Sequence, residues 1–313
     1  MSEENFGIVL IMIKKNLSKK PALITLLILS LPISAESFQD GLIDKLNSSI
    51  TDIGFKKDHI ISDDGVIINY YIKGSKKNAL VFVHGYSCSS EYWWPQLEYF
   101  SKNYTTIAVD LAGHGKSGLN RKEYSMDAFG DDVKSVIEHL DLDQVVLIGH
   151  SMGGPVIVKA AGSLGAKSRL IIGVDTFHDL TTEGIGRFAR IAVNTMFQLF
   201  YDSMTKDSID DFFIDKTDKD LEDWIRNDAL KSPKNISQGT LDALLTMNYP
   251  ESLSELSIPM IALNARSFRE TKLDSNFDTY EDIQIEFMEE VGHFIMLERP
   301  DEFNKWLEAK ISE

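Results

Sequence analysis

The sequence predicts an α/β fold in which a mostly parallel sheet is covered by helices on both faces. Continuous apolar runs, typical of buried strands, alternate with segments of helical spacing over most of the chain. One such run, at 144–148, passes through a glycine-rich turn directly into a helical pattern. A hairpin precedes the alternation. This order is typical of one doubly wound domain, and 313 residues suffice for such a domain with an insertion.

The expected elements follow one another regularly. After a polar, helical lead at 38–50, two β-rich stretches at 55–62 and 66–73 flank Asp63-Asp64-Gly65, which is typical of a hairpin turn. The last expected helix begins at Pro300, and proline is favoured in the first turn of a helix. Buried strands are expected at 79–83, 104–109, 144–148, 169–174, 258–263 and 283–288, and helices at 126–140, after Ser151 and at 300–311.

The segment 176–254 interrupts the alternation. It is mostly helical in pattern and acidic, with apolar stripes that include Phe188 and Phe197. We therefore expect a helical cap over 176–254, inserted between two parts of one core at 36–175 and 255–313.

The amino-terminal region has the pattern of a secretory signal peptide. Several lysines precede the apolar run 21–32, and Ala35 offers a small residue for cleavage. We expect a signal peptide over 1–35 and a secreted or periplasmic protein, with an uncleaved anchor as the alternative. The pattern leaves open whether translation starts at Met1 or Met12.

Charge and cysteine content limit the partners. The formal net charge of −16 argues against binding to nucleic acid or to anionic lipid headgroups, which would be repelled. The single cysteine, Cys88, cannot form an internal disulfide, and no base lies near it in sequence to activate its thiol. Stability must therefore come from the hydrophobic core.

The turn Gly149-His150-Ser151-Met152-Gly153 places a serine between a strand and a helix. Such a sharp turn drives its central residue toward positive φ, and the flanking glycines let strand and helix approach closely. The helix that follows directs the N–H of Met152 toward the place where an oxyanion would form. This pattern indicates a nucleophilic serine.

Four motifs match, in order, those of the α/β-hydrolase family. Together they make the chain resemble the capped, esterase-like branch of this family over about residues 60–311. The motifs are His84-Gly85-Tyr86-Ser87, Asp110-Leu111-Ala112-Gly113-His114-Gly115-Lys116-Ser117, the Ser151 turn with Gly154, and Val291-Gly292-His293-Phe294.

The resemblance implies Ser151 as the nucleophile and His293 as the general base. A serine hydroxyl is a weak nucleophile near neutral pH, so an imidazole must take its proton during attack. The resemblance also implies an oxyanion hole formed by the backbone N–H groups of Tyr86 and Met152. Branches of the family that use an aspartate nucleophile are excluded by Ser151.

The third catalytic residue is less clearly indicated. Family members commonly carry an aspartate shortly after the penultimate strand, but residues 263–270 contain none. Asp175 ends the preceding strand, a position that some members use instead, and is the expected acid. Asp274 is the alternative, and a purely capping role for Asp175 also stays open.

These observations predict a serine hydrolase that cleaves a small carboxylic ester or related acyl compound without a metal or organic cofactor. Hydrolysis of C–C bonds, lactones or amides, and perhydrolysis, use the same residues, and a non-catalytic ligand receptor on this fold is a further alternative. A small-molecule substrate is the expected partner, and the oligomeric state is open. Aromatic residues that could line its pocket are Tyr86, Trp93, Trp94, Phe177 and Phe188.

Overall fold

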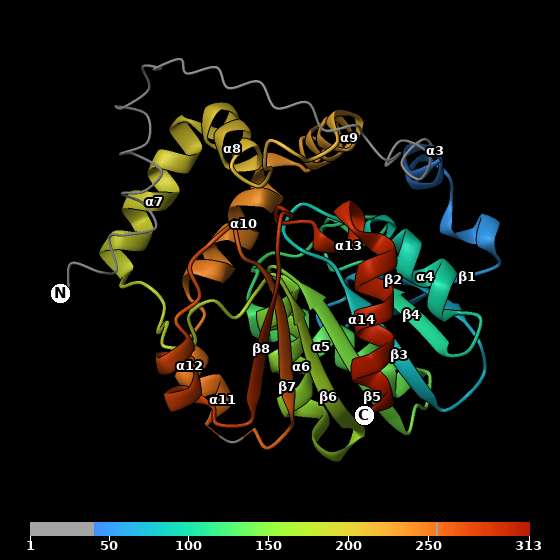
Figure 1. Ribbon diagram of the computed structural model, residues 1–313. Helices are drawn as coiled ribbons and strands as arrows, with labels where there is room; N and C mark the ends of the chain where they lie inside the picture. Colours follow the sequence, from blue (N-terminus) through green and yellow to red (C-terminus); the bar gives the residue numbers. More distant parts are fainter. Residues whose placement is uncertain (1–40, 255) are drawn as a thin grey trace.

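The chain folds around one eight-stranded sheet with the order β1-β2-β4-β3-β5-β6-β7-β8 (Figure 1). The computed structural model describes residues 41–254 and 256–313, so the predicted signal peptide at 1–35 lies outside the described residues. Strand β2 is antiparallel to β1 and β4, and the remaining neighbours are parallel. The strands are β1 (Lys56–Ile61), β2 (Ile67–Lys73), β3 (Asn78–Val83), β4 (Thr105–Val109), β5 (Gln144–His150), β6 (Ser168–Val174), β7 (Met260–Ala265) and β8 (Ile283–Met288).

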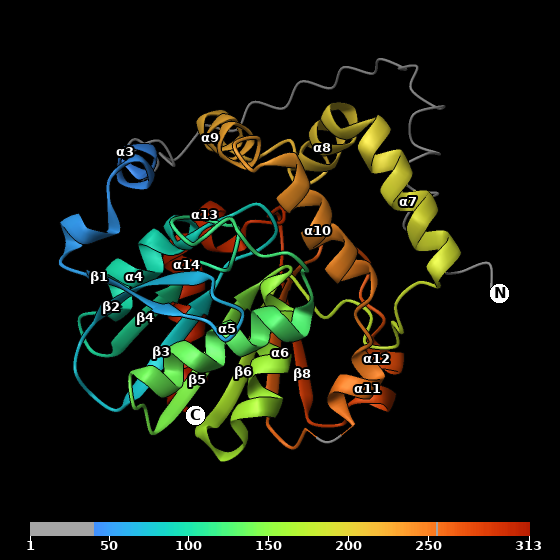
Figure 2. The same cartoon turned by 180° about the vertical axis from the view of Figure 1, so that it is seen from behind.

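Helices cover both faces of this sheet, as Figures 1 and 2 show from opposite sides. Helices α4 and α14 pack on one face, and α5 and α6 pack on the other. Helical segments are α3 (Leu42–Asn47), η3 (Ile50–Ile53), η4 (Ser90–Trp93), α4 (Trp94–Phe100), α5 (Met126–His139), α6 (Gly153–Leu164), η5 (Gly165–Lys167), α7 (Arg187–Leu199), α8 (Tyr201–Asp210), α9 (Lys219–Ala229), α10 (Lys234–Leu245), α11 (Tyr249–Leu253), α12 (Leu273–Thr279), α13 (Ile295–Glu298) and α14 (Pro300–Ser312).

The predicted fold class is confirmed. Strands β3 and β5 are buried from their second residue onward, as expected for apolar runs sandwiched between two layers of helices. The Asp63-Asp64-Gly65 hairpin joins β1 and β2, with Gly65 at φ +82°. The predicted lead helix at 38–50 is shorter among the described residues, because α3 ends at Asn47 and a 3₁₀ turn follows.

In the sequence, helices α7 to α11 come between β6 and β7, within the segment 176–254 that is predicted to be inserted. In Figure 1, α7 to α10 lie above the end of the sheet at which the parallel strands terminate. Helix α7 buries Phe197 but leaves Phe188 87% exposed, so the expectation that Phe188 lines a pocket is wrong. Trp93 belongs to the core instead, in contact with Phe82.

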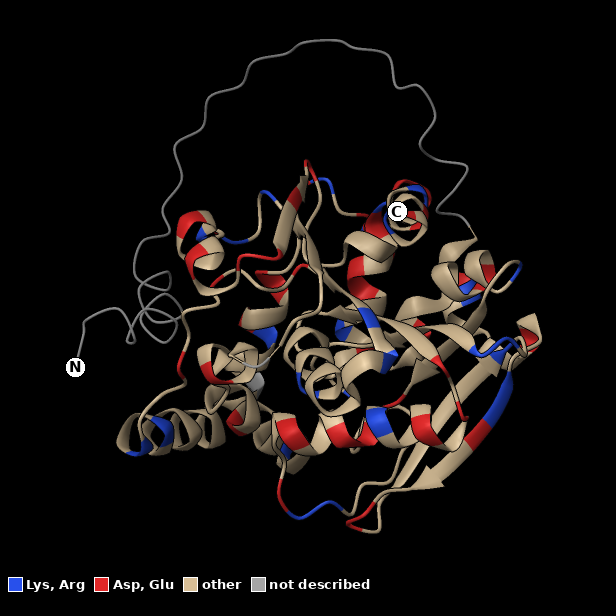
Figure 3. Ribbon diagram, turned by 90° about the horizontal axis from the view of Figure 1, so that it is seen from below, with Lys and Arg blue, Asp and Glu red and all other residues tan. Residues whose placement is uncertain are grey.

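Acidic and basic positions are interspersed along the helices in the view of Figure 3. Within 41–254 and 256–313, no helix has both the length and the apolar content needed to cross a bilayer. The same residues contain no group of three His, Cys, Asp or Glu side chains arranged to hold a metal ion.

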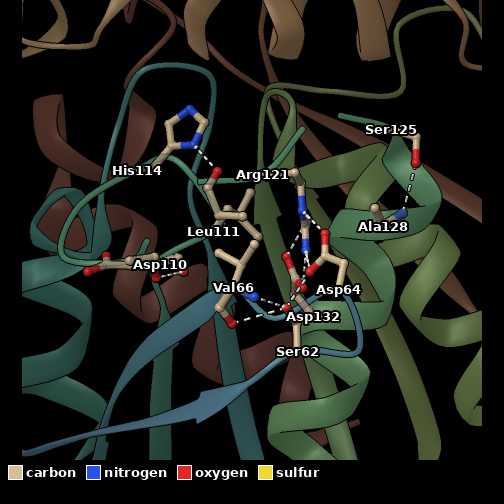
Figure 4. Close-up of polar contacts among 12 residues, drawn as sticks. Ser62, Asp64, Val66, Asp110, Leu111, His114, Arg121, Ser125, Ala128 and Asp132 are labelled. Atoms are coloured by element: carbon tan, nitrogen blue, oxygen red, sulfur yellow. Dashed lines mark hydrogen bonds and ion pairs between the residues drawn. The ribbon is translucent and has the colours of Figure 1, made fainter. Parts of the chain in front are cut away.

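A buried arginine ties the β1–β2 hairpin to helix α5. Arg121 donates two hydrogen bonds of 2.8 Å to the carboxylate of Asp132 and two, of 2.8 and 3.1 Å, to that of Asp64 (Figure 4). The side chains of Arg121 and Asp132 are 2% and 1% exposed. Ser62 also donates to Asp64, at 2.5 Å, so the hairpin turn is held from two sides.

Candidate active site

Strand β5 and helix α6 present Ser151 at a sharp turn. Ser151 has φ +52°, its N–H donates to the carbonyl of Val174 at 3.0 Å, and its carbonyl accepts from Gly154 at 2.9 Å. A side chain at Gly153 would place its Cβ only 2.5 Å from the Val83 carbonyl, so the close approach of α6 to β3 requires glycine there. The strained φ at Ser151 projects its hydroxyl beyond the end of the sheet.

The loop after β3 lies beside this serine. A Cβ added to Gly85 would lie 3.2 Å from Cβ of Ser151, which brings the backbone of Tyr86 close to the turn. In the described part of the chain, the N–H groups of Tyr86 and Met152 have no hydrogen-bond acceptor. Two backbone donors left unpaired beside a nucleophile are what an oxyanion hole requires. The Tyr86 hydroxyl points elsewhere and donates to the Ser237 carbonyl on α10 at 3.0 Å.

His293 and Asp175 meet at the end of the sheet. Nδ1 of His293 donates to Oδ2 of Asp175 at 2.5 Å. The other carboxylate oxygen of Asp175 accepts the N–H of Ala265, at the end of β7, at 2.7 Å. Asp175 has φ +46°, a strained value for a residue with a side chain, and this turn brings its carboxylate under the imidazole.

Burial governs the protonation of this pair. It lowers the pKa of His293, which favours the neutral imidazole that a general base needs. Burial raises the pKa of Asp175, while His178 and the Ala265 N–H oppose that shift. The hydrogen bond from Nδ1 leaves Nε2 of His293 as the nitrogen available to accept a proton.

Aromatic rings hold His293 in place. The ring centroids of Phe212 and Phe268 lie 4.6 and 4.5 Å from the centroid of the His293 ring, and each ring plane is tilted by 32° from that of His293. The Phe212 carbonyl accepts the His293 N–H at 2.8 Å, so the connection between α8 and α9 closes over the imidazole. Nε2 of His150 donates to the His293 carbonyl at 3.0 Å.

The loop around His293 is also held by a carboxylate. Glu298, on α13, accepts the N–H of Gly292 at 2.9 Å and that of Phe294 at 3.3 Å. The hydroxyl of Thr217, from the insertion, donates to the same carboxylate at 2.9 Å. The loop that carries His293 is therefore held by contacts to both α13 and the insertion, and burial raises the pKa of Glu298.

Ser151 and His293 lie on neighbouring loops. The ring of His150, adjacent to Ser151 in the chain, is 4.5 Å from the His293 ring. Within the described residues, no hydrogen bond joins the Ser151 hydroxyl to His293. Catalytic hydrogen bonds are often long in the absence of substrate and tighten when it binds.

The other sequence candidates lie away from this cluster. Asp274, on α12, and Glu270 are exposed, whereas Asp175 is 1% exposed against His293. Cys88 is buried, and burial raises the pKa of its thiol, which disfavours a nucleophilic thiolate.

Sequence reasoning missed two groups that lie beside the Asp175 carboxylate. One is the Ala265 N–H, and the other is His178, whose Nε2 lies 3.6 Å from Oδ1 of Asp175. The available signal was Asn264, which stands at the strand end where family members commonly carry a nearby acid.

Comparisons with known proteins agree with this fold. An esterase from Thermogutta terrifontis, solved with malate bound, superposes with a TM-score of 0.72 at 19% identity, covering 82% of this chain and 98% of that one. A 2-(acetamidomethylene)succinate hydrolase from Mesorhizobium japonicum is 33% identical over 46% of this chain and 53% of its own length. An (E)-2-((N-methylformamido)methylene)succinate hydrolase from Acinetobacter baylyi is 39% identical over 27% of this chain and 32% of its own length.

The chain thus aligns with about a third to a half of the length of these two curated relatives. The sequence profile described as "Alpha/beta hydrolase family" matches residues 80–306, which is more than half of the chain. That span includes the Ser151 turn, Asp175 and His293. The chain belongs to the alpha/beta hydrolase family.

Proposed function

We propose that the protein is a serine hydrolase that cleaves a small carboxylic ester or related acyl compound through an acyl-enzyme. The observation that carries this proposal is the 2.5 Å bond between His293 and a buried Asp175, beside a serine held at φ +52°. A strained serine next to an oriented imidazole is the arrangement that nucleophilic acyl transfer needs.

In the proposed reaction, Oγ of Ser151 bonds to the acyl carbon while its proton passes to Nε2 of His293. The N–H groups of Tyr86 and Met152 donate to the developing oxyanion. His293 then returns the proton to the departing alkoxide, which leaves as an alcohol. Water repeats the sequence on the acyl-enzyme and releases the carboxylic acid. Asp175 keeps the proton of His293 on Nδ1 and stabilises the imidazolium.

The helical insertion supports a substrate of modest size. Residues 176–254 act in this proposal as a cap, because Phe212 contacts His293 and Ser237 accepts the Tyr86 hydroxyl. Phe268, from the core, contacts the same imidazole. A site so enclosed by aromatic rings favours a small acyl or aryl group over a polymer.

A fluorophosphonate probe tests the class of reaction. We expect stoichiometric labelling of the wild-type protein, no labelling of Ser151→Ala, and full labelling of the control Cys88→Ala. Failure of the folded wild-type protein to react would favour the non-catalytic receptor. p-Nitrophenyl esters of increasing chain length would then define the acyl group that the site accepts.

Amide hydrolysis is the second candidate, because both curated relatives above are named for substrates with an N-acyl group. Incubation with 2-(acetamidomethylene)succinate separates the two candidates. Release of acetate faster than any p-nitrophenyl ester is cleaved, measured as kcat/KM, would favour the amide.

We also propose that the protein is exported after cleavage at Ala35. The support is the basic and apolar pattern of residues 1–35. Amino-terminal sequencing of the mature protein should begin at or near Glu36, and a terminus at Met1 or Met12 would contradict cleavage.

A further inference from the structure

The hydrogen bonds around His178 favour one of its two neutral tautomers. Asn264 accepts the N–H of Thr176 through Oδ1 at 3.1 Å, which identifies its Nδ2 as the donor. That Nδ2 lies 3.1 Å from the Thr271 hydroxyl and 3.4 Å from Nδ1 of His178. Because Thr271 accepts from Asn264, its own hydroxyl proton is free to point at Nδ1, 2.9 Å away.

The amide nitrogen of Asn264 can only donate, and the Thr271 hydroxyl can donate as well, so these contacts favour Nδ1 as the unprotonated nitrogen. In the neutral imidazole the proton then sits on Nε2, which faces Oδ1 of Asp175 at 3.6 Å. Burial lowers the pKa of His178 to about 4, so the ring is neutral near pH 7. Among the described residues Nε2 has no hydrogen-bond partner, although His178 is only 8% exposed, and Oδ1 of Asp175 is the acceptor that it faces.

Hydrogen bonds and two residues with positive φ also fix the backbone around His178. The His178 carbonyl accepts from the N–H of Lys272 at 2.8 Å and from Asn276 Nδ2 at 3.3 Å. Asp175 and Phe177 both have positive φ, at 46° and 58°. This strained segment turns the two side chains of Asp175 and His178 toward each other.

We propose that His178 is a positioning residue whose Nε2–H faces the second oxygen of Asp175 and keeps that carboxylate ionised and aimed at His293. This inference rests on the proposed function. Asp175 accepts hydrogen bonds from His293 and Ala265 and faces Nε2 of His178 at 3.6 Å, so a carboxylate taken from β6 is surrounded by groups on three separate segments. Asn264, near the end of β7, and Thr271, in the segment that follows, favour the tautomer in which Nε2 of His178 carries the proton.

Two other charged groups, Arg269 and Glu298, also interact electrostatically with Asp175. Arg269, after β7, favours the ionised carboxylate and disfavours protonation of His293 and His178. Glu298, on α13, is the nearby group of like charge, and its own pKa is raised in part by Asp175. Neither group changes when His178 is replaced, so a shift on replacement reports the missing Nε2–H.

The test has two readouts. Long-range ¹H–¹⁵N spectra of ¹⁵N-histidine-labelled protein at pH 7 should show His178 with its proton on Nε2, and a proton on Nδ1 would overturn the proposal. The second readout is the rate of fluorophosphonate labelling of Ser151 against pH. In His178→Phe the Asp175–His293 pair should take up a proton more readily. The pH below which the labelling rate falls, the acid limb of the pH–rate profile, should therefore rise by about one pH unit. At a fixed pH below this limb, the variant should be labelled about tenfold more slowly than the wild type.

His178→Gln is the matched control, since its amide nitrogen can occupy the place of Nε2 and should restore the wild-type limb. Thr271→Val removes the hydroxyl beside Nδ1 but leaves the His178 side chain unchanged. It should move the acid limb in the same direction by a smaller amount. An unmoved limb in a folded, labelled His178→Phe would overturn the proposal. Unlabelled wild-type protein that retains the Nε2–H tautomer would instead show that the proposed function has failed.

Discussion

Nδ1 of His293 and Oδ2 of Asp175 lie 2.5 Å apart although 118 residues separate them in the chain. The two side chains come from the ends of different strands, β6 for the acid and β8 for the segment leading to the imidazole. The N–H of Ala265, at the end of β7, fills the remaining side of the carboxylate. Asp175, the proposed acid, therefore lies one strand earlier than is common in this family, while the intervening strand contributes a backbone donor.

Asp175→Asn should lower kcat by about 10³ to 10⁴-fold, because an amide cannot hold the His293 proton on Nδ1 and the wrong tautomer results. KM should change little, since Asp175 is buried beneath the imidazole. The measurement is steady-state hydrolysis of the best p-nitrophenyl ester.

Asp274→Asn is the matched control for that substitution. Asp274 is exposed on α12, and its replacement should leave kcat within about twofold of wild type, as for most surface changes. The opposite ranking of the two variants would reassign the acid to Asp274.

The rate should fall as the pH drops below about 7. In the proposed mechanism activity requires Asp175 to be ionised and His293 to be neutral, and burial raises the pKa of Asp175 to about 7. Lowering the pH therefore adds a proton to the pair and removes the base, whereas raising the pH does not. The measurement is kcat/KM between pH 5 and 9 with a non-ionising ester. A rate that stays constant down to pH 5 would contradict this reading.

The fold was accessible from sequence because its signals are local. Buried strands such as β3 are continuous apolar runs, and the Ser151 turn has glycines where a Cβ would collide with Val83. Phe188 shows the limit of such reasoning. Helical spacing identifies an apolar stripe on α7 but cannot say whether anything covers it, and here Phe188 is 87% exposed.

The surroundings of the acid were harder to foresee, because they depend on contacts between distant segments. Asp175 could be suggested from its place at a strand end, but its distance to His293 is set by the positive φ at residue 175. The Ala265 donor is a backbone group, which leaves no trace in residue type. His178 belongs to no motif, and only the folded chain brings it to Asp175.

Tyr86→Phe should retain kcat within about threefold. The proposed oxyanion donor is the backbone N–H, and the substitution removes only the bond from the hydroxyl to the Ser237 carbonyl. A larger effect on KM is expected, because that bond ties α10 to the loop after β3. A fall in kcat of about 100-fold, the usual cost of one oxyanion donor, would show that the phenol itself acts in the transition state.

Arg121→Met should lower the free energy of unfolding by about 3 to 5 kcal/mol at pH 7, because Asp132 would remain buried without its partner. Burial already raises the pKa of Asp132 to about 6, and loss of the guanidinium would raise it further. Because the neutral carboxyl tolerates burial, the loss should shrink as the pH falls toward 4. Urea unfolding at several pH values measures this loss of unfolding free energy.

The control is Lys77→Met, which removes an exposed ion pair with Asp141 and should lower the free energy of unfolding by under about 1 kcal/mol at any pH. Equal losses for both variants would mean that burial of the Arg121 pair carries no energetic weight.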